Sequence, residues 1–146
     1  MLQKNIVYVS DTHFGHENII KYCERPWVNV SKMDNDLFTN LMAFDRSDTS
    51  IVHMGDFAFK MPQYKFSHPE NHILIMGNHD KGDASKYTDW FGTVVGTPKT
   101  WRNHVHIIED NGKKIMLSHA PQDNLNGCDF NIYGHTHNSV FKQPEY

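Results

Sequence analysis

Five short apolar runs in this chain each end at aspartate, asparagine or histidine side chains, and this arrangement strongly constrains the fold. Short apolar runs bounded by turn-forming residues are typical of buried strands. The runs occupy residues 5–9, 51–54, 72–76, 113–118 and 130–133. The polar side chains that follow them are Asp11 and His13, Asp56, Asn78 and His79, His119, and finally His135 and His137. Because ligands bind beyond the carboxyl ends of strands in open α/β sheets, we expect all five clusters to share one crevice.

The segments between these runs predict helices and one hairpin. Residues 31–44 carry apolar side chains at helical spacing, which predicts an amphipathic helix with Ser31 as its N-cap. Shorter helices are expected at residues 17–22 and 84–91. The Asp-Asn-Gly sequence at residues 110–112 predicts a tight hairpin between strands on either side of it. Early strands that alternate with helices, followed by a hairpin, indicate an α/β fold with an antiparallel portion.

The length and composition exclude several classes of protein. The chain has 146 residues, so we expect a single domain spanning residues 1–146. No apolar stretch approaches the ~20 residues needed to span a membrane, and no signal peptide is expected. The two cysteines, Cys23 and Cys128, form no CxxC motif, which favours a reducing cytoplasm. A formal net charge of −3 argues against a long nucleic acid as partner.

The residues that follow the strands are suited to binding divalent metal ions. Asp11 and His13 are two positions apart, as are His135 and His137, so on an extended segment each pair points to one side. Oxygen and imidazole donors without thiolate favour a catalytic site for Mn, Fe, Zn or Mg-like ions. Seven candidates exceed the needs of one ion, but two shells of four result if Asp56 bridges. Two ions ~3.5–4 Å apart clamp a phosphoryl group and generate hydroxide near neutral pH.

The order of these blocks resembles that of the calcineurin-like metallophosphoesterases. The blocks are Asp11-x-His13, Gly55-Asp56, Gly77-Asn78-His79-Asp80, a lone His119 and Gly134-His135-Thr136-His137. They occur in the family's order and span residues 11 to 137, almost the whole chain. The resemblance implies a two-sheet α/β sandwich of minimal size, with a dinuclear metal site at the carboxyl ends of the strands. It further implies a hydrolase that cleaves phosphate esters with a bridging hydroxide.

The resemblance also implies roles for individual residues. One ion would be bound by Asp11, His13, Asp56 and His137. The other would be bound by Asp56, Asn78, His119 and His135, with Asp56 bridging the two. His79 corresponds to the family's catalytic histidine, and Asp80 is expected to orient His79 by accepting its other N–H. The implied cofactors are two divalent ions, with Mn, Fe, Zn, Ni and Co as candidates.

Two features narrow the expected substrate. The stretch from Asp56 to Gly77 is short and leaves no room for a capping domain, so we expect a small phosphate ester. The segment at residues 11–20, followed by Arg25-Pro26-Trp27, resembles a small bacterial and phage subgroup of the family. The expected location is therefore the cytoplasm of a bacterium or of a phage-infected host.

The sequence leaves open which residues contact the substrate, which substrate is bound, and which of several functions the protein has. His16, Arg25 and Asn78 are candidates for contacting the substrate, but His16 and Arg25 equally fit surface positions. Aromatic residues such as Trp101 can stack on a substrate ring or belong to the core. The substrate is a phosphate mono- or diester: a nucleotide, a cyclic nucleotide or a nucleic-acid end. The alternatives are a nuclease acting on DNA or RNA, and a non-catalytic interaction module on the same fold.

Overall fold

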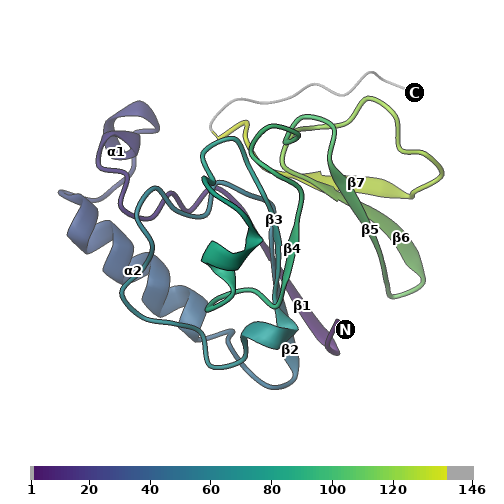
Figure 1. Ribbon diagram of the computed structural model, residues 1–146, viewed down its shortest axis with the longest axis horizontal. Coiled ribbons are helices and arrows are strands. Elements are labelled where there is room, and N and C mark those ends of the chain that lie inside the picture. The colour runs from purple at the N-terminus through teal and green to yellow at the C-terminus, as the bar shows by residue number, and fades with distance from the viewer. Residues whose placement is uncertain (1, 138–146) are drawn as a thin grey trace.

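The computed structural model describes residues 2–137, which form two β-sheets and two α-helices (Figure 1). The first sheet is wholly parallel, with its strands in chain order: β1 (Asn5–Val9), β2 (Thr49–His53), β3 (Ile73–Ile75) and β4 (Thr93–Val95). The second sheet holds β5 (Val105–Asp110), β6 (Lys113–Ser118) and β7 (Phe130–Tyr133). In it β5 and β6 are antiparallel, whereas β6 and β7 are parallel. The expected two-sheet α/β architecture is confirmed.

The parallel sheet lies between two apolar layers. Strand β2 is buried along its whole length, as expected for a parallel strand covered on both faces. Ile51 and Leu74 point to the layer that packs against α2, and the neighbouring Val52 and Ile73 point to the layer between the two sheets. Figure 1 shows this order, with α2 on one side of β1–β4 and the second sheet on the other.

The helices differ from expectation at their ends. Helix α1 spans Asn18–Tyr22 and helix α2 spans Val30–Met42. The N-cap of α2 is Asn29, whose side-chain oxygen accepts the Lys32 N–H at 2.8 Å, so the prediction of Ser31 was wrong. Ser31 lies inside the first turn instead. None of the helices formed by residues 2–137 combines the length and apolarity needed to cross a membrane.

The shorter elements show where local signals are strong and where they are weak. Residues 84–91 were expected to form a helix, but only a 3₁₀ turn at Ala84–Tyr87 forms, after another at Pro69–Asn71. Strand β4 was not expected from its three residues. The hairpin between β5 and β6 is confirmed, and Asn111 and Gly112 both have positive φ (50° and 74°), as a type I′ turn requires.

Two histidines near the parallel sheet are structural. His72 is fully buried; its Nδ1 accepts the Ile51 N–H at 3.0 Å, so its Nε2–H donates to Asp45 Oδ1, also at 3.0 Å. His53 is also fully buried, and burial lowers its pKa to about 3. Its Nδ1 accepts the Gly55 N–H at 3.1 Å. These neutral rings hydrogen-bond the backbone of β2 and the turn that follows it.

Candidate metal centre

All five polar clusters lie at the carboxyl ends of strands, on one side of the molecule. Asp11 follows β1, Asp56 follows β2, and Asn78 follows β3. From the second sheet, His119 follows β6 and His135 follows β7. The two sheets therefore contribute donors to a single crevice, where two groups of side chains have their donor atoms within 4.8 Å of one another. One group is Asp11, His13, Asp56 and His137; the other is Asp56, His119 and His135.

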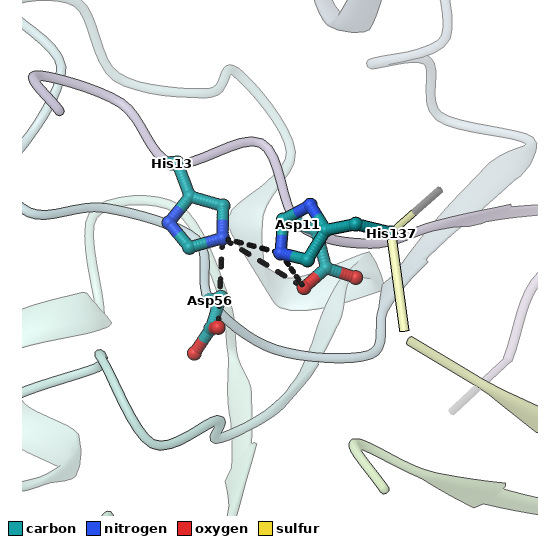
Figure 2. Close-up of side chains that lie close together, drawn as sticks. All are labelled: Asp11, His13, Asp56 and His137. Atoms are coloured by element: carbon teal, nitrogen blue, oxygen red, sulfur yellow. Dashed lines mark hydrogen bonds and ion pairs between the residues drawn. The ribbon is translucent and has the colours of Figure 1, made fainter. Parts of the chain in front are cut away.

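The first group points its donor atoms to a common point (Figure 2). The Nε2 atoms of His13 and His137 lie 3.2 Å apart. Asp11 Oδ1 lies 3.8 Å from His13 Nε2 and 3.4 Å from His137 Nε2. Asp56 Oδ2 lies 3.5 Å from His13 Nε2. Two imidazole nitrogens and two carboxylate oxygens in this arrangement form a donor set suited to a divalent cation.

The backbone at these residues is not extended. The expectation that each pair points to one side along an extended segment is therefore wrong. Asp11 and His13 have φ values of 54° and 53°, and His135 and His137 have 68° and 48°. Asp56, at 54°, shares this left-handed conformation. Positive φ is uncommon for residues other than glycine, although Asp and His tolerate it better than most, and it is costly in free energy. The side chains of each pair thus converge through tight turns rather than along a strand.

An unpaired buried oxygen supports a cation in the first group. Asp11 Oδ1 is buried and has no hydrogen-bond partner among the described residues, whereas Asp11 Oδ2 accepts the Ser10 hydroxyl at 2.6 Å and the His135 N–H at 2.9 Å. Burial opposes ionisation of Asp11, but the nearby His13 ring and the hydrogen bond from Ser10 outweigh it and lower its pKa well below the ordinary range. An ionised, buried oxygen that faces imidazole nitrogens matches a metal ligand.

The second group is oriented by the backbone. His119 is fully buried, and its Nδ1–H donates to the Met54 carbonyl oxygen at 2.7 Å, which leaves Nε2 unprotonated when the ring is neutral. His119 Nε2 lies 3.1 Å from Asn78 Oδ1 and 3.3 Å from Asp56 Oδ2. The Asn78 amide oxygen therefore joins Asp56, His119 and His135 as a fourth donor. The residues present thus fit a second cation as well as a first.

Asp56 is common to both groups. Its Oδ2 faces His13 Nε2 at 3.5 Å on one side and His119 Nε2 at 3.3 Å on the other. Its Oδ1 accepts the backbone N–H of His79 at 2.9 Å, which fixes the orientation of the carboxylate. Burial raises the pKa of Asp56, but the hydrogen bond and charge of His119 and the His79 N–H lower it overall. An ionised carboxylate thus lies between the two groups.

Glycine is required in the turn before Asp56. Gly55 has a φ of 96°, and a Cβ added there would lie 2.6 Å from His119 Nδ1 and 2.7 Å from the Gly77 nitrogen. A larger residue at position 55 would therefore both strain the backbone and displace a candidate ligand.

His79 lies beside the donors without joining either group. Its ring centroid is 5.5 Å from that of His13 and 6.0 Å from that of His16. Its backbone is held by Asp56, as described above, so its position is coupled to the metal centre. The His79 ring thus lies next to the first donor group, and its catalytic role stays a prediction.

Asp80 has a different role from the one expected. Its Oδ2 accepts the N–H groups of Asp56 and Gly77 at 2.8 and 2.9 Å, and its Oδ1 accepts those of Phe57 and Ala58 at 2.8 and 3.4 Å. The side chain is fully buried, and burial raises its pKa to about 6, although the backbone N–H groups of Gly77, Ala58 and Phe57 favour the ionised form. The expectation that Asp80 orients the His79 ring is corrected: its carboxylate ties together the turns that follow β2 and β3.

Arg25 and His16 both lie next to the first group. Arg25 donates from its two terminal nitrogens to the carbonyl oxygens of Asp11, at 2.5 Å, and Thr12, at 2.9 Å. It thereby supports the left-handed turn, and it also lines a cavity of about 340 Å³ beside His137. His16 Nδ1 lies 3.4 Å from His13 Nδ1. Both residues are therefore close enough to the centre to influence a bound anion.

Three further side chains lie next to the candidate metal centre. Cys23 Sγ lies 3.3 Å from His137 Nδ1. The Trp101 ring lies 4.6 Å from that of His135. Phe59 stacks on His16 with a centroid distance of 5.3 Å. Phe59 lies three residues after Asp56 in the loop beyond β2, whereas Cys23 follows α1 and Trp101 lies between β4 and β5, so spacing in the sequence does not connect these two with the ligands.

The two-sheet α/β fold and these two donor groups define an α/β protein with a candidate metal-binding site, and comparison with known proteins shows its family. Residues 5–145 match the calcineurin-like phosphoesterase superfamily domain, and the chain belongs to that family. The chain is similar to the uncharacterized protein MJ1445 of Methanocaldococcus jannaschii, with 34% identity over 94% of this chain and 72% of that protein. It also resembles the crystal structure of AQ665, a protein of unknown function from Aquifex aeolicus. That match has a TM-score of 0.64 and 29% identity, covering 89% of this chain and 77% of the other.

Proposed function

We propose that this protein is a metal-dependent phosphoesterase that hydrolyses a small phosphate mono- or diester at a centre holding two divalent ions. The observation that carries the proposal is the position of Asp56 Oδ2, which faces His13 Nε2 at 3.5 Å and His119 Nε2 at 3.3 Å. A carboxylate between two sets of donors is suited to bridge two cations. Ions bound there would neutralise phosphoryl oxygens and lower the pKa of water enough to supply hydroxide near neutral pH.

The chain's own residues would position and protonate the substrate. His79 lies next to the first group and outside the ligand set, so its ring is placed to donate a proton to a phosphoryl or leaving oxygen. The Asn78 side-chain amide carries N–H donors as well as its candidate ligand oxygen, so it is suited to contact the same phosphate. His16 and Arg25 border the first group and add donors on that side.

A panel of esters tests the proposal. We expect hydrolysis of bis-p-nitrophenyl phosphate or p-nitrophenyl phosphate in the presence of Mn, Ni, Co, Zn or Mg, and loss of this activity in Asp56→Asn. Asp89→Asn, which changes an exposed carboxylate paired with Lys65, is the matched control and should retain activity. A protein that binds metal but cleaves no ester would instead be a non-catalytic module. Cleavage confined to long DNA or RNA would identify a nuclease.

A further inference from the structure

Two exposed pairs of an aromatic ring and a cation flank the candidate metal centre. The first pair is Phe59 and Lys81, with the Lys81 Nζ 5.2 Å from the centroid of the Phe59 ring. The second pair is Trp101 and Arg102, with the Arg102 guanidinium carbon 4.4 Å from the centroid of the Trp101 ring. We refer to them as the Phe59 rim and the Trp101 rim. Neither pair is explained by binding of the metal ions themselves.

The Phe59 rim adjoins the first donor group. Phe59 stacks on His16 with their planes 24° apart, and His16 in turn contacts His13. Phe59 is 49% exposed. The ring therefore presents apolar surface to solvent beside a crevice that is otherwise polar.

The Trp101 rim adjoins the second donor group. The Trp101 ring is 4.6 Å from that of His135 and 5.6 Å from that of His119, so it lies against two candidate ligands. Trp101 is half-buried, and the guanidinium of Arg102 is exposed at the surface. Each donor group thus has one aromatic ring beside it, and a cationic side chain lies over each of these rings.

We propose that the two rims bind the two nucleosides of a dinucleoside phosphodiester whose phosphate is held at the metal centre. This inference rests on the proposed phosphoesterase function and specifies its substrate class. A diester carries an organic group on each side of phosphorus, whereas a monoester carries one and would leave one rim without a role. Every nucleobase has a flat face that stacks on aromatic rings, and Lys81 and Arg102 lie over the rings of the two rims, where cation–π contact also favours a bound base.

The reaction balances as a hydrolysis. The oxygen of one water molecule forms a new bond to phosphorus, and one P–O ester bond breaks. The leaving oxygen takes up a proton, so the products are one nucleoside monophosphate and one nucleoside. The bases take no part in bond making, so the rims contribute binding and orientation only.

The test uses four dinucleotides with one and the same sugar–phosphate backbone. They are thymidylyl-thymidine, the two analogues in which one or the other base is absent, and the analogue lacking both bases. In the wild type, removing either base should lower kcat/KM about tenfold, in line with the loss of one stacked base. In Phe59→Leu the effect of one base should disappear, and in Trp101→Leu the effect of the other. Tyr64→Leu alters an aromatic residue that is 64% exposed away from the centre, and it should leave all ratios unchanged.

The doubly abasic diester separates this inference from the proposed function. Because Trp101 contacts His135, each variant is compared with its own rate on the doubly abasic diester, and its metal content is measured. If the wild type cleaves that diester but gains nothing from either base, or if both variants keep the wild-type ratios, the assignment of the rims is overturned while the phosphoesterase proposal stands. A rate that continues to rise with strand length beyond two nucleotides would also overturn it. Failure of the wild type on every ester with every metal would overturn both.

Discussion

Replacing Asp80 by asparagine should destabilise the fold and weaken metal binding together. The carboxylate is fully buried and accepts four backbone N–H groups, two on each oxygen. An asparagine side chain keeps one acceptor oxygen and turns an NH₂ group toward the other two donors, leaving them without partners. Each of the two unsatisfied buried donors costs about 1–3 kcal/mol, so we expect a loss of about 2–6 kcal/mol. That is a large fraction of the ~5–15 kcal/mol that stabilises a typical domain.

Urea unfolding followed by tryptophan fluorescence measures this effect, since Trp90 is buried in the core. With an m-value of about 2 kcal/mol/M, the midpoint should fall by roughly 2 M. Asp89→Asn is the control, because its carboxylate is an exposed partner of Lys65 and should move the midpoint little. If Asp80→Asn unfolds at the same urea concentration as the control and loses only turnover, the backbone role assigned to Asp80 is refuted. Orientation of His79 would then be its function.

Three further results are expected. His79→Ala should retain its metal ions and lose about 10²–10⁴-fold in kcat, and loss of an ion on metal analysis would instead make His79 a ligand. Burial opposes ionisation of Asp45, but N–H groups of Ser67, His72 and His68 outweigh it and lower its pKa. Ionised Asp45 therefore stabilises the fold at pH values above about 4, which is the pKa of an aspartate in the unfolded chain. This stabilisation is lost as the pH falls through the lower pKa that Asp45 has in the folded protein. Asp45→Asn should consequently lose less stability than the wild type between pH 5 and pH 3, and equal losses in urea titrations would contradict this. Finally, turnover of a small ester should change little between 50 and 200 mM salt, whereas a steep salt slope on duplex DNA would indicate a nuclease.

Local signals in the sequence were sufficient to predict most of the strands and the hairpin. The hairpin follows from Asn111 and Gly112, whose positive φ values are cheap for these two residue types. The strands follow from short apolar runs, and strand β7 has the bounds that were expected, but the expectation that β1 and β7 are buried was wrong: their residues are half-buried or exposed. Because parallel strands of one sheet end at a common edge, the positions of Asp11 and Asp56 also predicted that they would meet.

The remaining features depend on contacts between distant segments. Strand β4 has only three residues, and it is defined by pairing with β3 rather than by its own sequence. The four hydrogen bonds of Asp80 connect two turns that follow different strands, so an Asn-His-Asp sequence does not reveal them. The contact between Trp101 and His135 also joins segments that are far apart in the sequence, so the sequence does not reveal it. The left-handed conformation of Asp11 occurs in a turn where the carbonyl oxygens of Asp11 and Thr12 accept hydrogen bonds from Arg25, which is distant in the sequence.

Counting the metal ions bound per chain, and relating that number to turnover, tests the central claim most directly. The wild type, freed of metal and titrated with Mn²⁺ in a calorimeter, should bind two ions, and ester hydrolysis should appear as the sites fill. Asp56→Asn should hold fewer ions than His137→Ala or His135→Ala, because Asp56 Oδ2 faces both donor groups. A wild type that binds one ion at full activity, or an Asp56→Asn variant that binds two ions tightly with near-native turnover, would contradict the shared role of Asp56.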